Sequence, residues 1–272
     1  MPFNLFDVKD KVIVVTGGMG QLGIQFVQTL HSAGARVAVL DVAIDEKQVS
    51  EKYKHLANDP ALMFEYCDIT SKESIKDTLI KIIDNWDVPH GLINNAALDS
   101  PPNSKSDENG PFETYPEESW DKVMDVNAKG VFLICQEIGG AMAEAGRGSI
   151  INVSSIYGIV SPNQSLYEYR RQSGDDFFKP VAYSASKSAL LNLTRYLSTY
   201  WGSKNVRVNA MILGGVFNNQ DKKFLDGYES LVPLGRMANE NEYNGAAIFL
   251  LSDASSYMTG SNLVLDGGWT AW

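Results

Sequence analysis

A tyrosine and a lysine four positions apart form a pair with clear chemical potential. Tyr183 and Lys187, in the segment Tyr183-Ser184-Ala185-Ser186-Lys187, stand near the start of a stretch with helical periodicity. Residues at i and i+4 share one face of a helix, so the phenol and the ammonium would lie together. A phenol with a pKa near ~10 is a poor base, and a neighbouring cation favours the phenolate and lowers that pKa. The pair therefore predicts a general acid/base for an alcohol–ketone step.

A glycine-rich segment lies near the N-terminus, between a β-branched apolar run and a stretch of helical period. It reads Thr16-Gly17-Gly18-Met19-Gly20-Gln21-Leu22-Gly23. Glycines let the backbone turn tightly and approach a pyrophosphate, whose charge is favoured at a helix N-terminus. An ordinary tight turn is the alternative. The strand before and the helix after supply the context that favours a dinucleotide site.

An aspartate ends the next apolar run. Asp41 closes the segment 36–41, and no Arg or Lys stands beside it between Val39 and Ile44. A carboxylate at this point accepts hydrogen bonds from both hydroxyls of an adenosine ribose and repels a 2′-phosphate. Asp41 could also simply cap a turn. In combination with the glycines, it predicts NAD as the cofactor in preference to NADP.

Short apolar runs alternate with segments of helical period along the chain. Expected strands cover 11–15, 36–41, 62–67, 91–94, 149–153, 206–212 and 262–265, and expected helices cover 20–33, 45–56, 71–85, 117–145, 182–201 and 240–252. This alternation predicts an α/β fold, a Rossmann-type doubly wound parallel β-sheet of about seven strands with helices on both faces. Loops are expected at 99–116, 160–180 and 213–239. No repeat or linker is evident, so residues 1–272 are expected to form a single domain.

The composition argues against several other classes of protein. The 23 Lys+Arg against 33 Asp+Glu give a net charge of −10, which disfavours a protein that coats nucleic acid. The two cysteines, Cys67 and Cys135, cannot make a disulfide framework, and no CxxC spacing suits a metal site. No segment reads as a secretory signal or as a membrane span of roughly 20 apolar residues. We therefore expect a cytoplasmic protein without metal, membrane or nucleic-acid partners.

Further motifs follow one another in the order typical of a known family. They are Cys67-Asp68-Ile69-Thr70, Asn94-Asn95-Ala96-Ala97, Asn127, Ser154-Ser155 and Leu265-Asp266-Gly267-Gly268. With the motifs above, the chain resembles the single-domain branch of the short-chain dehydrogenase/reductase family over nearly its whole length. A narrower resemblance, to dehydrogenases of flagellin-glycan and legionaminic acid pathways, is carried by the segment 160–180 together with 214–220, 233–238, 252–260 and 266–272.

The family resemblance implies a role for each motif residue. The catalytic set would be Tyr183 as acid/base, Lys187 as its partner and ribose ligand, Ser155 on the substrate oxygen, and Asn127 anchoring a relay water. NAD would be bound by Gly17, Gly18, Gly20, Gln21, Leu22, Gly23, Asp41, Asp68, Ile69, Asn95, Ala96, Ala97, Tyr183, Lys187, Gly214 and Val216. Each has a structural alternative, such as a turn serine at Ser155 or a solvated charge at Lys187. Their shared order favours the catalytic interpretation.

Three departures from the family pattern concern the cofactor end. Gln21 stands where the usual TGxxxGxG motif has glycine, and Ala97 stands where NNAG has glycine. Leu213 and Asn218 replace the usual proline and threonine on either side of Gly214. These changes leave the predicted fold intact. They bear on how the pyrophosphate is held and on how the loop after Gly214 closes.

The segment between Ser155 and Tyr183 is longer than family members usually have. Residues 160–180 would emerge beside the active site, because both flanks are catalytic, and with 213–238 they are expected to form a substrate cap. A solvated flap is the alternative. Arginines suit bidentate contacts with phosphate or carboxylate. The expected substrate contacts are Ser155, Tyr157, Tyr167, Arg170, Arg171 and Asn218.

The polar borders of this site predict a hydroxylated substrate. The expected reaction is NAD-dependent interconversion of an alcohol and a ketone on a sugar or sugar phosphate, in a surface-glycan pathway if the narrower resemblance holds. The alternatives are a polyol or sugar-acid dehydrogenase similar to gluconate 5-dehydrogenases, or an epimerase or lyase that retains NAD. A non-catalytic dinucleotide-binding scaffold is least favoured. The family and the apolar C-terminus imply a homodimer or homotetramer.

Overall fold

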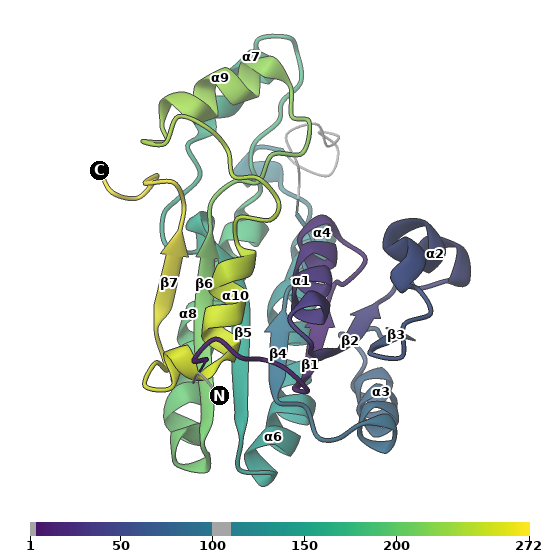
Figure 1. The fold of residues 1–272 in the computed structure, drawn as a ribbon. Helices are drawn as coiled ribbons and strands as arrows, with labels where there is room; N and C mark the ends of the chain where they lie inside the picture. The colour runs from purple at the N-terminus through teal and green to yellow at the C-terminus, as the bar shows by residue number, and fades with distance from the viewer. Residues whose placement is uncertain (1–3, 100–109) are drawn as a thin grey trace.

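The computed structural model describes residues 4–99 and 110–272. Seven parallel strands form one sheet in the order β3-β2-β1-β4-β5-β6-β7 (Figure 1). Their bounds are β1 Val12–Thr16, β2 Arg36–Asp41, β3 Leu62–Tyr66, β4 Gly91–Asn94, β5 Gly148–Ser155, β6 Val206–Leu213 and β7 Asn262–Leu265. The strand order reverses direction between β1 and β4, as in a doubly wound sheet. The predicted fold class is confirmed.

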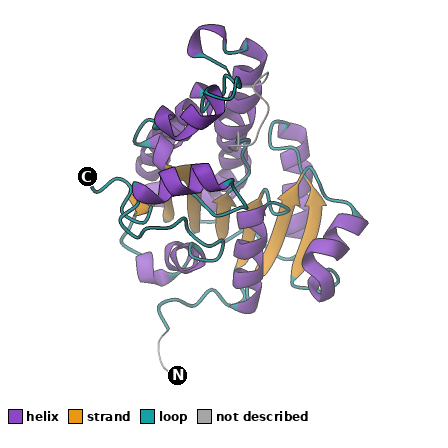
Figure 2. Ribbon diagram, turned by 90° about the horizontal axis from the view of Figure 1, so that it is seen from above, coloured by secondary structure: helices purple, strands orange, loops and turns teal. Residues whose placement is uncertain are grey.

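Helices cover both faces of the sheet (Figures 1 and 2). One face carries α1 (Gln21–Ser32), α2 (Glu46–Tyr53) and α10 (Asn244–Leu251). The other carries α3 (Lys72–Asn85), α8 (Val181–Trp201) and a continuous helical stretch made of α4 (Glu117–Met124), two wide-turn segments Asp125–Gly130 and Cys135–Gly139, α5 (Val131–Ile134) and α6 (Gly140–Glu144). No helix in the described parts of the chain is long and apolar enough to cross a membrane.

The central strands are apolar on both sides because both sides are covered. Val12 and Val14 pack into the core beneath α3 and α8, while Ile13 and Val15 pack into the core beneath α1 and α10. All four side chains are almost completely buried. A continuous β-branched run therefore satisfies both faces of a parallel sheet at once.

Two helices lie beyond the carboxyl ends of the strands, at the top of Figure 1. They are α7 (Glu168–Arg171) and α9 (Lys222–Ser230), and both fall in segments expected to be loops. The start of α9 has a recognisable signal, since the Asp221 side chain accepts a hydrogen bond from the Phe224 amide and caps the helix. The prediction of a loop over 213–239 is therefore wrong for its central part.

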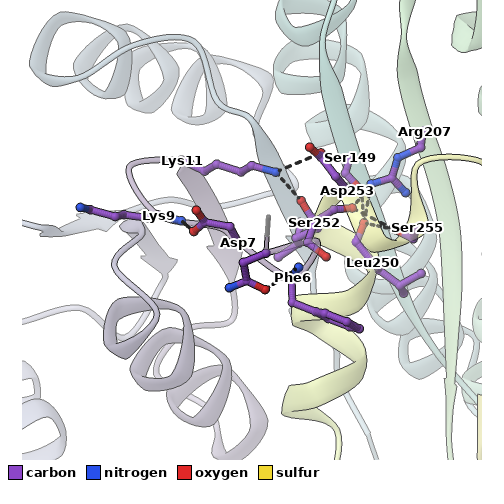
Figure 3. Close-up of polar contacts among 12 residues, drawn as sticks. Phe6, Asp7, Lys9, Lys11, Ser149, Arg207, Leu250, Ser252, Asp253 and Ser255 are labelled. Atoms are coloured by element: carbon purple, nitrogen blue, oxygen red, sulfur yellow. Dashed lines mark hydrogen bonds and ion pairs between the residues drawn. The ribbon is translucent and has the colours of Figure 1, made fainter. Parts of the chain in front are cut away.

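At the amino ends of the strands, polar side chains hold the C-terminus of α10 (Figure 3). They come from β5, from β6 and from Lys11, which directly precedes β1. The Leu250 carbonyl accepts from Ser149 Oγ at 2.6 Å and from Arg207 Nη2 at 2.7 Å. Lys11 Nζ donates to the Leu251 carbonyl at 3.1 Å. The last carbonyls of a helix have no partners within it, and cations are favoured there. These contacts fix α10 against the sheet far from the strands' carboxyl ends.

Candidate active site

A cleft of about 290 Å³ lies at the carboxyl ends of β1, β4, β5 and β6. Ligands of doubly wound sheets bind at this edge, next to the point where the strand order reverses. The cleft is where many of the predicted residues meet. Those that line it are Gln21, Leu22, Asn95, Ala97, Ser155, Tyr157, Tyr167, Tyr183, Lys187, Gly214, Val216 and Asn218.

The predicted catalytic side chains converge from β5 and α8. Ser155 ends β5 and lines the cleft with Tyr183, and its hydroxyl partly lowers the pKa of the Tyr183 phenol. Lys187 Nζ lies 5.8 Å from the centroid of the Tyr183 ring and donates to the Val153 carbonyl at 2.9 Å. Ser154 Oγ donates to the Lys187 carbonyl at 2.8 Å, which ties the helix to the strand. The register of α8 on β5 thus places all three functional groups together.

The charge environment of the pair differs from the expectation drawn from Lys187. Burial, and then the Asp99 carboxylate, raise the pKa of the Tyr183 phenol, and the Ser155 hydrogen bond lowers it only in part. Burial also lowers the pKa of Lys187 to about 8. Desolvation is the largest cause of both pKa shifts, because it penalises both charged forms. The chain's own groups therefore keep Tyr183 protonated and ready to donate.

Asn127 lies in the widened helical turn Asp125–Gly130 and is completely buried. Its side-chain oxygen accepts from the Leu98 amide at 2.7 Å, and its Nδ2 donates to the Leu98 carbonyl at 2.9 Å and to Ser186 Oγ at 3.1 Å. The side chain ties the segment after β4 to α8 and lies outside the lining of the cleft. Widened turns of this kind occur frequently at functional sites.

The glycine-rich segment forms a close-packed cradle at the end of β1. Gly17 has a φ of +64°, and a Cβ there would lie 2.7 Å from Ala96 Cα. A Cβ on Gly23 would lie 2.1 Å from the Gly17 carbonyl oxygen. α1 then begins at Gln21 with no side-chain cap and no acidic residue in its first turn. The positive end of its dipole is left uncompensated, and the arrangement fits a pyrophosphate.

Asp41 stands beside this cradle at the end of β2. Its Oδ2 accepts from the Met19 amide at 2.9 Å, and its Oδ1 accepts from the Ala43 amide at 3.0 Å. The Nζ of Lys52, from α2, donates to the Met19 carbonyl at 2.5 Å. A cation therefore does lie near Asp41. Lys52 lies outside the segment Val39–Ile44, whose lack of Arg and Lys is the basis for the prediction of NAD.

The remaining predicted cofactor residues follow strands at the same edge, outside the lining of the cleft. Asp68 Oδ1 accepts from the amide and the hydroxyl of Thr70, at 2.8 and 2.7 Å, which shapes the turn after β3. Ile69 is buried against Gly130 of the long helical stretch. The Ala96 amide donates to Thr16 Oγ1 at 3.1 Å and so joins β4 to β1. Their observed contacts are structural.

Arg170 and Arg171 hold the segment 160–180 together and do not reach the cleft. Arg170 Nε donates to Asp175 Oδ2 at 2.7 Å, and its guanidinium lies 4.1 Å from the Phe177 ring centroid. Arg171 donates to the carbonyls of Phe177 at 3.0 Å and Gln164 at 2.7 Å. Backbone carbonyls in irregular structure need such donors. The structure thus replaces the predicted substrate contact of both arginines by internal hydrogen bonds.

Two charged residues of the cleft were not predicted to be site residues. Lys179 is 6% exposed, lines the cleft, and forms an ion pair with Asp99. The signal was present, because Lys179 stands four positions before Tyr183. Asp99 was noticed only as the start of a polar segment, whose residues 100–109 lie outside the described part of the chain.

Gln21, at the position where the family usually has glycine, contacts the loop after β6. Its Nε2 donates to the Phe217 carbonyl at 2.9 Å and to Glu240 Oε2 at 3.4 Å. The Asn218 amide, next in the chain, donates to Gln220 Oε1 at 2.7 Å. The departure at Gln21 therefore links the cradle to the loop that borders the cleft.

Comparison with known proteins identifies the family. A family model described as "Enoyl-(Acyl carrier protein) reductase" matches residues 19–270. An NAD-dependent glycerol dehydrogenase of Listeria innocua is 33% identical over 270 residues, which cover 97% of this chain and 96% of that protein. The chain belongs to the short-chain dehydrogenase/reductase family. It is accordingly an oxidoreductase, as the Tyr183–Lys187 pair predicts.

Two further comparisons agree with this assignment. A D-threitol dehydrogenase of Mycolicibacterium smegmatis is 29% identical over 97% of this chain and 95% of its own length. A solved structure of a short-chain dehydrogenase from Leptospira borgpetersenii, with bound NAD+, superposes with a TM-score of 0.83 at 31% identity, covering 99% of this chain and 97% of that one. The family assignment thus extends over the whole sheet and its helices.

Proposed function

We propose that this short-chain dehydrogenase/reductase interconverts a secondary alcohol and a ketone on a small polyol or sugar, with NAD. The observation that carries the proposal is the convergence of Tyr183, Lys187 and Ser155 in one polar cleft. The names of the glycerol and threitol dehydrogenases support a polyol. They favour the polyol and sugar-acid alternative over a sugar phosphate of a glycan pathway, since neither relative carries a glycan-pathway name.

NAD fits the residues at the carboxyl ends of β1 and β2. The glycine cradle and the N-terminus of α1 would hold the pyrophosphate, and Asp41 would accept from the hydroxyls of the adenosine ribose. Lys187 would donate to the nicotinamide ribose. When bound, the oxidised nicotinamide supplies a hydride acceptor and a positive charge that favours the Tyr183 phenolate.

In alcohol oxidation, Ser155 donates a hydrogen bond to the substrate oxygen, and Tyr183 accepts the hydroxyl proton at its phenolate oxygen. In the reverse direction, Tyr183 returns that proton to the ketone oxygen. Asn127 would anchor the relay water through the backbone of its widened turn, because its side-chain amide already contacts Leu98 and Ser186. The catalytic set remains the one that the sequence predicts.

The proposal treats residues 1–272 as a single domain. Within it, the segments 160–180 and 213–238 would form a cap over the substrate end of the cleft. Both contribute side chains to the cleft, namely Tyr167, Lys179, Asn218, Gln220, Phe224, Tyr228 and Met237. Their mixture of hydroxyl, amide and aromatic groups suits the polar edges and apolar faces of a polyol or sugar. The cap would set substrate preference, and the β5–α8 pair would perform the chemistry.

The proposal also includes assembly into a homodimer or homotetramer. Tyr196 and Tyr200 stack on α8 with 61% of each side chain exposed, and Phe132 on α5 is 48% exposed. Aromatic groups gathered on helices of one face suit burial against a second copy. Light scattering coupled to gel filtration tests this part, and a monomer at micromolar concentration would contradict it.

A substrate screen tests the reaction. Purified protein with NAD is offered glycerol, threitol, galactose, gluconate and phosphorylated counterparts, and NADH absorbance is followed. Activity on a neutral polyol or sugar supports the proposal, and activity confined to the phosphorylated compounds overturns the substrate class. Retained NAD with substrate consumed but no NADH would point to an epimerase or lyase.

The matched control is Tyr183→Phe, which removes the proton-transferring hydroxyl but keeps the ring. It should abolish turnover and leave NAD binding, followed by fluorescence titration, within about twofold of the parent. Equal activity in Tyr183→Phe would refute the mechanism.

A further inference from the structure

The ion pair Asp99–Lys179 is the one charged feature of the described cleft that the mechanism does not use. Apart from Lys187, these two residues carry the only formal charges among the cleft's described lining residues. Lys179 is buried, with 5% of its side chain exposed, whereas 48% of the Asp99 side chain is exposed. A buried ammonium is costly unless paired, so the pairing explains why Lys179 can stand in the cleft at all.

Lys179 is fixed beside the catalytic tyrosine from both ends. Its backbone amide donates to Gln164 Oε1 at 3.0 Å, and its carbonyl accepts from Gln164 Nε2 at 3.0 Å. Its Nζ lies 4.8 Å from the centroid of the Tyr183 ring. The backbone contacts with Gln164 and the ion pair with Asp99 together place the ammonium beside the Tyr183 ring.

Asp99 reaches the same point from the segment after β4. It lines the cleft together with Tyr157, Tyr167 and Tyr183, and its charge raises the pKa of all three phenols. Its carboxylate can accept additional hydrogen bonds besides the one from Lys179. The pair therefore offers an acceptor and a donor side by side.

We propose that Asp99 and Lys179 are the specificity-determining pair of the proposed polyol oxidation, binding the hydroxyl on the carbon next to the one that reacts. A hydroxyl group donates to a carboxylate and accepts from an ammonium at the same time, which matches the pair. The inference rests on the proposed function and deepens it. It names a neutral vicinal diol as the preferred substrate element.

The same pair disfavours an anionic substrate. A carboxylate or phosphate in place of that hydroxyl would compete with Asp99 for Lys179 and would lie next to a like charge. No arginine occurs among the described residues that line the cleft, and the second lysine there, Lys187, donates to the Val153 carbonyl and is assigned to the cofactor ribose. Neutral glycerol should therefore be a better substrate than glycerate, by at least about tenfold in kcat/KM.

The experiment compares matched alcohols with NAD: isopropanol against propylene glycol for the adjacent hydroxyl, and glycerol against glycerate for the charge. Asp99→Asn and Lys179→Met should each lower kcat/KM for propylene glycol relative to isopropanol at least about tenfold, because a change in the pKa of Tyr183 would affect both alcohols alike and leave this ratio unchanged. Asp99→Asn should also narrow the preference for glycerol over glycerate, because it removes the carboxylate that repels an anion. Lys81→Met, which breaks the ion pair between α3 and Glu65 of β3 outside the cleft lining, is the control and should change nothing.

The inference is overturned if wild type prefers glycerate, or if both variants lower kcat for isopropanol and propylene glycol alike. The second result would mean that the pair acts only through Tyr183 or through folding. Thermal unfolding of both variants, and of Lys179→Gln as a second variant, separates these causes, because only an effect on folding lowers the Tm. Failure of the proposed function looks different, because wild type would then oxidise none of the four alcohols.

Discussion

Replacing Asp41 by alanine tests the cofactor end most directly. Both carboxylate oxygens are oriented by backbone amides, Oδ2 by Met19 and Oδ1 by Ala43, so the ribose hydroxyls would meet a preorganised acceptor. Hydrogen bonds to a charged group contribute about 1.5–3 kcal/mol. Asp41→Ala should therefore lower kcat/KM with NAD by about tenfold to a hundredfold.

The same change should improve the use of NADP. Two like charges about 4 Å apart repel by about 1 kcal/mol in bulk water and about 4 kcal/mol at an effective dielectric constant of about 20. Removing the Asp41 charge relieves this repulsion. The Lys52 ammonium, which donates to the Met19 carbonyl, would then attract the 2′-phosphate. The ratio of kcat/KM for NAD over NADP should fall at least about a hundredfold.

The assay is initial-rate kinetics with each cofactor at one saturating alcohol concentration. Lys52→Met in the Asp41→Ala background is the matched control, and it should remove most of the gain with NADP but not the loss with NAD. Thermal unfolding shows whether the variants stay folded. An unchanged cofactor ratio in folded Asp41→Ala, or a wild type that prefers NADP, would refute the reasoning about Asp41.

Three more predictions follow from the site and its surroundings. Burial lowers the pKa of Lys187 from 10.5 to about 8, so between these pH values the unfolded chain binds more protons than the folded chain. The unfolding free energy of wild type should therefore rise by about 1–3 kcal/mol relative to Lys187→Met as the pH rises from 8 to 10.5. Urea unfolding at several pH values measures this difference. A pH-independent difference would contradict this. Gln21→Ala should speed exchange of the Phe217 amide, which donates to the Ala238 carbonyl, up to about tenfold, because the loop loses the hydrogen bond from Gln21 to the Phe217 carbonyl; unchanged exchange would disprove the link. Arg171→Gln should lower the unfolding free energy by about 1–3 kcal/mol and leave the preference between galactose and galactose phosphate unchanged; a changed preference would restore a substrate role for this residue.

The parts of the molecule that could be predicted are those encoded by local pattern. The strands follow from runs such as Val12–Thr16, and the cradle follows from glycines between a strand and a helix. α9 was missed although Asp221 caps it and Phe224 and Tyr228 stand one turn apart, because the surrounding segment shows no sustained period. Short helices over a cleft depend on packing more than on periodicity.

Contacts between side chains far apart in the sequence could not be predicted from local sequence patterns. Lys179 and Asp99 are 80 positions apart, and Lys52 is 33 positions from Met19, so only the folded sheet brings them together. The arginines at 170 and 171 differ, because the partners described for them stand within seven positions along the chain. Their residue type suggests an anion site, but the choice between a substrate and a backbone carbonyl depends on where the fold points each guanidinium. Chemistry read from residue types therefore needs tertiary placement before it becomes a site.

The substrate end has an apolar cluster of its own, separate from the two cores that flank the sheet. Tyr167 and Phe177 of the segment 160–180 pack with Phe224 and Tyr228 of α9, and Tyr228 stacks on Trp269 near the C-terminus with 4.6 Å between ring centroids. Cooperative units in proteins follow such clusters and open with their own free energies. Ala210 and Ile212 of β6 belong to the same cluster, so the two cap segments, the catalytic end of the sheet and the chain's last residues are joined in one packed unit. A substitution at Trp269 would therefore disturb the substrate end although Trp269 does not line the cleft.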